Sequence, residues 1–292
     1  MQDFLYYLKT NKLKSENTLI AYKRDLSNFQ KFMKESRNKN LAACDESDAI
    51  AYVLNLNTQN KSKATVNRSI SALRTFYDYK ILMGQRLENP FLKIKTYKNE
   101  SREIDYLTIE EVERLLALPD DSNKGLRDRA LLEFMYGTGA RVTEVVRLKI
   151  SDLNIRMGFV TLKDANDESR IVPLGKYAID SMVKYLAESF SSLKGEGADE
   201  DDYIFINFRG EALSRQGIWK ILKEYGAEIG LADRMTPQIL RDSFAVHILQ
   251  NGGDLKTLQE LMGFDDMSVG ITYLAVTDIH VREVFARCHP RA

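Results

Sequence analysis

The chain has 292 residues, 44% of them hydrophobic, and its 42 basic and 42 acidic residues give a formal net charge of zero. This length favours two domains of about 150 residues each. No apolar run reaches the roughly 18 residues of a transmembrane helix, which excludes a membrane protein of that kind, and the first residues lack a signal-peptide pattern. With two distant cysteines and three histidines, we expect a cytoplasmic protein with reduced thiols, no metal site and no membrane partner.

The charge is unevenly distributed along the sequence. Residues 1–100 contain 18 Lys and Arg against 10 Asp and Glu, whereas residues 101–292 contain 24 against 32. The basic first third suits a partner rich in phosphate, because neutralised phosphates release their counterions. A solvated helical face would produce the same excess, so charge alone leaves both interpretations open.

The first third has the period of amphipathic helices. Apolar residues recur every three or four positions in TLIAYKRDLSNFQKFMKE, residues 18–35, and again in SKATVNRSISALRTFYDYKILMG, residues 62–84. A helix with an apolar back and a basic front can pack and contact a DNA backbone at once, although an ordinary amphipathic surface looks the same. The candidate DNA-contacting residues here are Lys61, Lys63, Arg68 and Arg74.

A domain boundary is expected near residue 92. Asn89 and Pro90 end a helix, and the charged stretch that follows has few core-forming side chains. We therefore predict an N-terminal helical, DNA-clamping domain over residues 1–92. A linker would cover residues 93–104, and a second domain residues 105–292.

The second domain is predicted to be helical with a small sheet. LTIEEVERLLAL forms a helix capped by Thr108, and a longer apolar helix runs to Tyr136, breaks at residues 137–139 and restarts at Arg141. Two short strands flank a polar turn at residues 164–169, and residues 201–213 predict another strand and turn. The remaining segments are helical: 214–230, 237–252, 254–264, 268–276 and 280–288. The fold class is mainly α with a small antiparallel β-sheet.

Two long motifs follow one another in the second domain: YGTGARVTEVVRLKISDLN and, further along, LRDSFAVHILQNGGDLKTLQELMGFDDMSVGITYLAV. They resemble the first arginine motif and the C-terminal signature of the tyrosine recombinases, or phage integrase family, and especially of its bacterial Xer branch. The resemblance covers nearly the whole chain. It implies an all-α, SAM-like core-binding domain and an α+β catalytic-type domain. It also implies metal-independent chemistry without a cofactor, in which a tyrosine attacks a DNA phosphodiester and forms a 3′-phosphotyrosyl link.

The resemblance carries over to individual residues. Arg141 and Arg241 match the family's two arginines, whose planar guanidinium groups suit the charge of a pentavalent transition state. Tyr273 matches the nucleophile by its spacing from Gly263. Glu144 matches a supporting acid that would orient a guanidinium. Taken singly, each of these residues could equally be a surface charge or a packed aromatic.

The expected proton carriers are missing. Gln238 replaces a histidine, Phe264 replaces a histidine or tryptophan, and Ala165 aligns with the lysine of the hairpin turn. Glutamine hydrogen-bonds to phosphate but relays no proton near pH 7. Losing one general acid or base typically costs about 10²–10⁴ in rate. Lys163 could reach the leaving oxygen from its strand, although an ordinary exposed lysine is the simpler interpretation.

Two further residues in the signature are interpreted from their surroundings. Asp242 replaces a histidine common in relatives, and we expect it to pair with Arg241 and to repel phosphate. His247 is expected to be a satisfied helix histidine. The helix that opens with SRQG supplies the candidate DNA contacts of the second domain, which are Arg209, Ser214, Arg215 and Gln216.

The sequence therefore predicts an Xer-like, DNA-binding protein for site-specific recombination through Tyr273, with impaired catalysis. Three alternatives remain. One is an active recombinase in which Gln238, Lys163 or a partner subunit fills the gaps, the second is a non-catalytic DNA-binding regulator, and the third is a protein-interaction module on the same fold that does not bind DNA. The expected partners are double-stranded DNA and a second Xer-type recombinase. We expect a tetramer on DNA, a monomer when free, and a nucleoid-associated location. The segment 280–288 would be donated to a neighbouring subunit.

Overall fold

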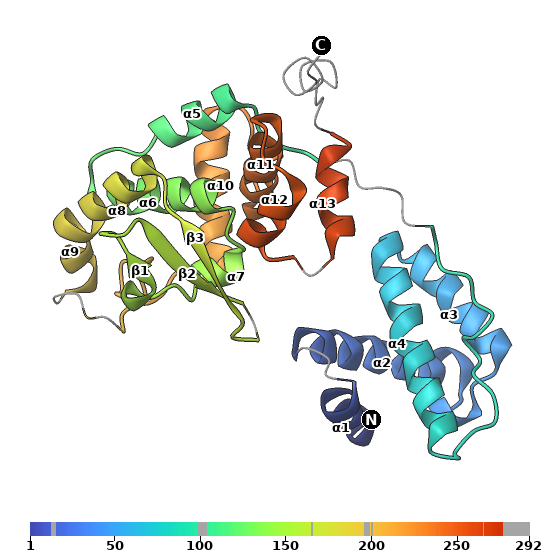
Figure 1. Ribbon diagram of the computed structural model, residues 1–292. Helices are drawn as coiled ribbons and strands as arrows, with labels where there is room; N and C mark the ends of the chain where they lie inside the picture. Colours follow the sequence, from blue (N-terminus) through green and yellow to red (C-terminus); the bar gives the residue numbers. More distant parts are fainter. Residues whose placement is uncertain are drawn as a thin grey trace, which may run out of the picture. The chain divides into compact units, whose positions relative to one another are not determined.

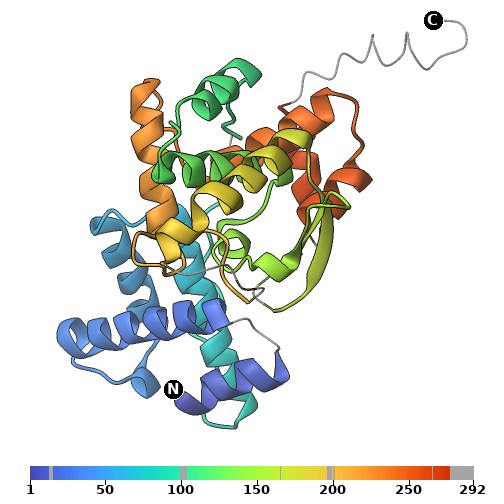
Figure 2. The ribbon, with the colours of Figure 1, turned by 90° about the vertical axis from the view of Figure 1, so that its left-hand side faces the viewer.

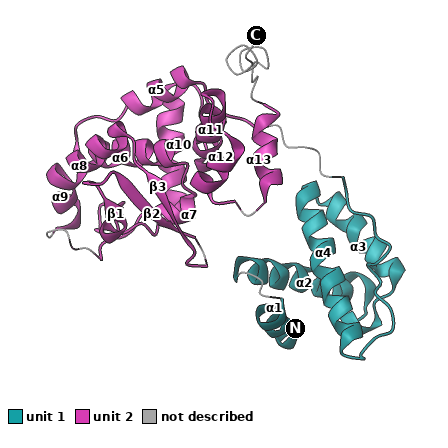
Figure 3. Ribbon diagram, in the orientation of Figure 1, with its two compact units in different colours: residues 1–102 teal, residues 103–292 magenta. Residues whose placement is uncertain are grey.

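A computed structural model of the protein describes residues 1–12, 16–98, 104–164, 166–195, 199, 201–264 and 266–276. The chain forms two compact units, residues 1–102 and 103–292, coloured separately in Figure 3. No helix within these described ranges is long and apolar enough to cross a membrane. The expected helix at 280–288 lies outside the described residues, as do Ala165, His280, Cys288 and His289.

The first unit is helical, as predicted (Figure 1). The apolar stripes of its two longest helices meet in one core that includes Phe29, Ile70 and Tyr77. The second of these helices begins after Ser62, whose hydroxyl accepts a hydrogen bond from the backbone N–H of Thr65. In chain order the elements are α1 (Gln2–Asn11), α2 (Glu16–Arg37), η1 (Leu41–Ala43), α3 (Glu46–Thr58) and α4 (Lys63–Leu82).

The second unit combines helices with a small sheet (Figures 1 and 2). Thr108 caps its first helix in a reciprocal capping box with Glu111, which confirms the predicted start. Its helices are α5 (Ile109–Ala117), α6 (Asn123–Thr138), α7 (Val142–Val145), η2 (Ile150–Asp152), α8 (Lys176–Glu188), α9 (Phe190–Lys194), α10 (Arg215–Glu228), α11 (Pro237–Gln250), α12 (Leu255–Met262) and α13 (Met267–Leu274).

The sheet is antiparallel with the strand order β1 (Leu153–Asn154), β2 (Phe159–Lys163), β3 (Ser169–Pro173). Strands β2 and β3 confirm the predicted pair, and Val160 lies opposite Val172. The strand predicted in residues 201–213 is wrong, because the described part of that segment contains only isolated bridges. Its apolar residues 204–206 are buried consecutively instead of alternating, so they fill the core without presenting a strand face.

The break between α6 and α7 lies against α11. Helix α6 ends at Thr138, two residues beyond the predicted Tyr136, and Gly139 caps it with a left-handed φ of 59°. A Cβ at this position would lie 2.5 Å from the ring of Phe244, so only glycine permits the approach of α11. Arg141 then stands at the N-cap of α7, beside α11. The local turn thus positions one of the candidate site residues.

Candidate active site

Arg241 and Arg141 converge on the end of α12. Arg241 projects from α11 and is only 6% exposed. It donates hydrogen bonds to the carbonyl of Gly139 and, at 2.7 Å, to that of Met262. Arg141 donates to the carbonyl of Gly263, the residue that follows Met262. Burial and the nearby charge of Arg141 lower the pKa of Arg241 to about 10, so the side chain remains charged at neutral pH.

A third arginine, which sequence reasoning missed, joins this cluster. Arg170 on β3 donates through Nε to the carbonyl of Leu261 at 2.8 Å. Three consecutive carbonyls, 261–263, therefore each accept from a different arginine. The only sequence signal for Arg170 is its place in SRIVPLG, where a charge interrupts an otherwise apolar strand. The carbonyl end of a helix is negatively polarised and favours cations.

Glu144 on α7 holds two of these arginines. Its buried carboxylate accepts two hydrogen bonds from Arg170, at 2.5 and 2.9 Å, and one from Arg141 Nη1 at 3.1 Å. It also accepts from the backbone N–H of Arg141 at 2.6 Å. Burial alone would raise the pKa of Glu144, but the hydrogen bonds and charge of Arg170 outweigh it and hold the pKa below its ordinary value. Glu144 is therefore an ionised carboxylate that fixes both guanidinium groups.

Helix α13 lies against α11 (Figure 1), and Tyr273 on α13 is only 5% exposed. Its hydroxyl donates to Asp242 Oδ1 at 2.7 Å, and Gln238 Nε2 donates to the same oxygen at 2.8 Å. The expected pairing of Asp242 with Arg241 is wrong, because the guanidinium of Arg241 donates hydrogen bonds to backbone carbonyls instead. The phenol of Tyr273 is close enough to Arg241 to influence its pKa electrostatically.

The remaining candidate positions supply no proton carrier to this cluster. Phe264 is buried, and its ring lies 3.3 Å from where a Cβ on Gly270 would be, so it fills space. Lys163 Nζ donates to Asp152 at 2.7 Å, which ties it to η2. His247 shares a 2.9 Å hydrogen bond with the hydroxyl of Tyr136, and burial lowers the pKa of His247. The prediction of a satisfied helix histidine is confirmed.

The basic candidates of the first unit fall into two groups. Arg68 makes two 2.9 Å hydrogen bonds to the buried carboxylate of Asp25, which fastens α4 to α2. Arg74 donates to backbone carbonyls of residues 91 and 94. Lys61 and Lys63 are exposed. The two arginines thus have structural partners inside the unit, and DNA contact by any of these four residues stays a prediction.

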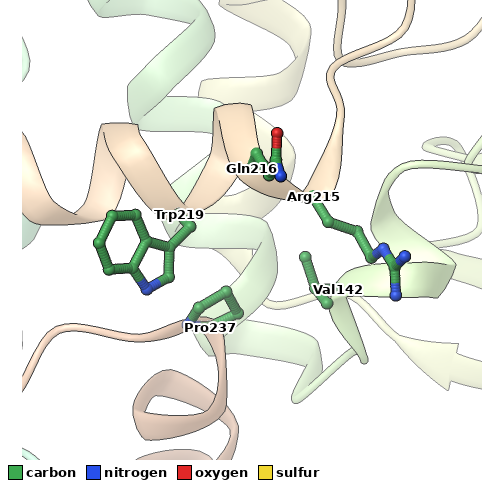
Figure 4. Close-up of a pocket in the computed structure, with 5 residues that line it drawn as sticks. All are labelled: Val142, Arg215, Gln216, Trp219 and Pro237. Carbon is green, nitrogen blue, oxygen red and sulfur yellow. The ribbon is translucent and has the colours of Figure 1, made fainter. Parts of the chain in front are cut away.

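A surface cavity of about 350 Å³ opens beside the start of α10 (Figure 4). Arg215 and Gln216 open α10 and Pro237 opens α11, so two helix N-termini border it. Helix N-termini carry partial positive charge and unpaired N–H groups, which favour anions. In Figure 4, Trp219 and Arg215 lie across the cavity from Pro237 and Val142.

The exposed candidates Arg209 and Ser214 lie before this helix. The hydroxyl of Ser214 caps α10 by accepting from the N–H of Gly217 at 3.0 Å. Its side chain is therefore already used in helix capping. In the described part of the chain, no group of three or more His, Cys, Asp or Glu residues could hold a metal ion.

Known proteins share this architecture. Residues 105–280 match the phage integrase family, and residues 1–84 match the SAM-like N-terminal domain of phage integrases. The tyrosine recombinase XerD of Listeria innocua serovar 6a is 39% identical over 294 residues, which cover 100% of this chain and 99% of that protein.

Two solved structures show the same fold. One is the Tn1549 transposon integrase in complex with a circular intermediate DNA, with a TM-score of 0.78, 16% identity and 98% of each chain covered. The other is the XerH site-specific recombinase bound to a palindromic difH substrate in a post-cleavage complex. Its TM-score is 0.73 at 22% identity, covering 97% of this chain and 93% of that one.

Proposed function

The chain belongs to the phage integrase family and is an Xer-like tyrosine recombinase; from this premise we propose that it cleaves and rejoins duplex DNA through Tyr273. The observation that carries the proposal is the convergence of three arginines on consecutive carbonyls at the end of α12. A phenol on α13 lies in electrostatic range of one of them, Arg241. This arrangement supplies a nucleophile beside fixed positive charge.

The charge of the cluster suits a phosphodiester. Three guanidinium groups face two carboxylates, those of Glu144 and Asp242, which leaves one net positive charge to bind one phosphate. Extra negative charge develops on the phosphoryl oxygens in the transition state, and prearranged guanidinium groups stabilise it without reorganising. Arg141 and Arg241 take this role in the proposal, while Glu144 orients Arg141.

Cleavage is expected to be slower than in relatives that carry a histidine at position 238. Gln238 donates its amide hydrogen to Asp242 and exchanges no proton, and Phe264 has no polar group. Lys163 would have to leave Asp152 to serve as an acid. The expected penalty for one missing acid or base is about 10²–10⁴ in rate.

The proposed substrate is duplex DNA. Arg215, together with the N-termini of α10 and α11, offers a phosphate site in the second unit, and Arg209 and Gln216 lie close by in sequence. Lys61 and Lys63 are the exposed basic residues of the first unit that we assign to the DNA backbone. We also propose that the protein forms a tetramer on DNA with a second Xer-type recombinase, at the nucleoid.

The test is formation of a covalent adduct. Short duplexes of randomised sequence are enriched for binding, nicked at each position in turn, incubated with the protein and analysed under denaturing conditions. We expect a protein–DNA band that disappears in Tyr273→Phe and persists in Tyr177→Phe, a matched change at an exposed tyrosine. A wild-type protein that binds these duplexes without any adduct would contradict cleavage.

That contrary result would support the second candidate function, a non-catalytic DNA-binding regulator. Two observations favour this alternative: the replacement of proton carriers by Gln238 and Phe264, and the burial of Tyr273 with its hydroxyl occupied by Asp242. A regulator would retain salt-dependent DNA binding in Tyr273→Phe, because phosphate attraction does not depend on the phenol.

A further inference from the structure

The contact between Tyr273 and Asp242 gives the nucleophile an acceptor for its proton. The 2.7 Å separation of the phenol oxygen and Asp242 Oδ1 lies within the reach of a general base, about 2.6–3.2 Å. Both side chains are only 5% exposed, so bulk water does not compete freely for this bond. The carboxylate therefore faces the one proton that must leave when the phenol attacks phosphorus.

The nearby guanidinium groups do not compete for this proton. Arginine accepts no proton in this range, since it is already fully protonated. Gln238 reaches the same carboxylate oxygen from one helical turn earlier and fixes its position. By the resemblance to the family, Asp242 occupies a position at which a histidine is common. Gln238 occupies the position of a second histidine of the family.

Several charged groups lie near the contact between Tyr273 and Asp242. Arg241 lies on the same helix, Arg141 and Glu144 come from α7, and Arg170 comes from β3. His247, further along α11, is turned to Tyr136 on α6. The three guanidinium groups offset the two carboxylates, so the side chain of Asp242 can remain beside a bound phosphodiester.

We propose that Asp242 is the general base for Tyr273, a role that rests on the proposed DNA cleavage. As the phenol oxygen bonds to phosphorus, its proton passes to Asp242 Oδ1. The bond from phosphorus to the 5′-oxygen breaks, and this oxygen takes a proton from a water molecule. In rejoining, a 5′-hydroxyl attacks the phosphotyrosine and releases its proton to water. The bond from phosphorus to the tyrosine oxygen breaks, and Asp242 returns its proton to the departing phenol oxygen. Gln238 is a positioning residue for Asp242.

Asp242→Asn tests the proposal, because asparagine keeps an oxygen acceptor of the same shape but takes up no proton. With the nicked duplexes described above, we expect adduct formation by Asp242→Asn to fall about 10²–10⁴-fold at neutral pH. Asp180→Asn, a matched change on the exposed face of α8, should cleave at the wild-type rate. DNA affinity and thermal unfolding of each variant report whether it is folded.

The pH profile separates a base from a structural contact. If the proton passes directly to Asp242, attack does not depend on free phenolate, so the wild-type rate should change little between about pH 6.5 and 8.5. Without the base, attack depends on free phenolate, and the rate of Asp242→Asn should rise about tenfold per pH unit towards the ordinary phenol pKa near 10. Gln238→Ala should slow cleavage and keep the flat profile.

A DNA substrate with sulfur in place of the 5′-bridging oxygen provides a further test. Its leaving group is a thiolate, which needs no proton to depart. The defect of Asp242→Asn should persist on this substrate. Full rescue by sulfur would overturn the proposal, since Asp242 would then act on the leaving group. An unchanged or faster rate in Asp242→Asn would also overturn it, whereas a wild type that forms no adduct would remove the proposed cleavage itself.

Discussion

Replacing Glu144 with glutamine should selectively destabilise the second unit. The carboxylate is 2% exposed and accepts four hydrogen bonds from Arg141 and Arg170. Glutamine has the same size, but its amide N–H₂ would point at guanidinium N–H groups, and the neutral side chain would leave two partly buried arginines without a counter-charge. Removing one partner of a buried ion pair costs about 3–5 kcal/mol.

We expect a loss near the lower limit, about 3 kcal/mol, because Arg141 is partly exposed and both arginines keep their backbone carbonyls. For a unit of this size, that loss corresponds to a fall of roughly 6–12 °C in the unfolding midpoint. Trp219 is the only tryptophan and lies on α10, so its fluorescence follows the second unit alone. Asp121→Asn, which removes an exposed ion pair with Lys184, should leave the midpoint unchanged.

The pH dependence adds an independent check on the same residue. The pKa of Glu144 is depressed in the folded state, so its stabilisation is fully present above the unfolded-state value of about 4.3. It is lost as the pH falls through the folded-state pKa. The stability gap between the wild type and Glu144→Gln should therefore narrow on acidification below about pH 4. A midpoint for Glu144→Gln equal to the wild type at pH 7 would refute the reasoning.

Three other changes have defined outcomes. Gln238→His should speed covalent adduct formation about 10²-fold in the nicked-duplex assay, because histidine exchanges protons near pH 7; an unchanged rate would show that position 238 is not limiting. Arg68→Ala should lower the free energy of unfolding of the first unit by about 2 kcal/mol, because the buried carboxylate of Asp25 loses its counter-charge. Lys61→Ala should leave that free energy unchanged and reduce the salt dependence of DNA binding by about one phosphate contact. Gly139→Ala should destabilise the second unit by about 2–4 kcal/mol in urea unfolding, since it combines a positive φ with a clash against Phe244.

Sequence patterns predicted the elements that depend on local order. Helical periodicity located α2, α4, α10 and α11, and Thr108 with Glu111 marked the start of α5. The glycines at 137 and 139 marked the break before Arg141. These features follow from neighbouring residues, so they could be read without knowing the tertiary structure.

Contacts between distant residues could not be read in this way. The contact of Arg68 with Asp25 could not be predicted, because the two residues lie 43 positions apart. Asp242 was expected to pair with its neighbour Arg241, yet α13 brings Tyr273 to it from 31 residues away. Arg170 could not be predicted, because its two partners, Glu144 and Leu261, come from α7 and from the end of α12. Which donor meets which acceptor is decided by packing, which a single sequence does not display.

The carbonyls at the end of α12 hold the side chains of Arg141, Arg170 and Arg241 together. Because each guanidinium is fastened to a successive peptide of that helix end, a shift of α12 would displace all of them as a set. Inserting or deleting a single residue within this helix would rotate its carbonyls by roughly 100° and misalign every attachment at once. The length of α12 should therefore tolerate far less variation than the surface loops around it.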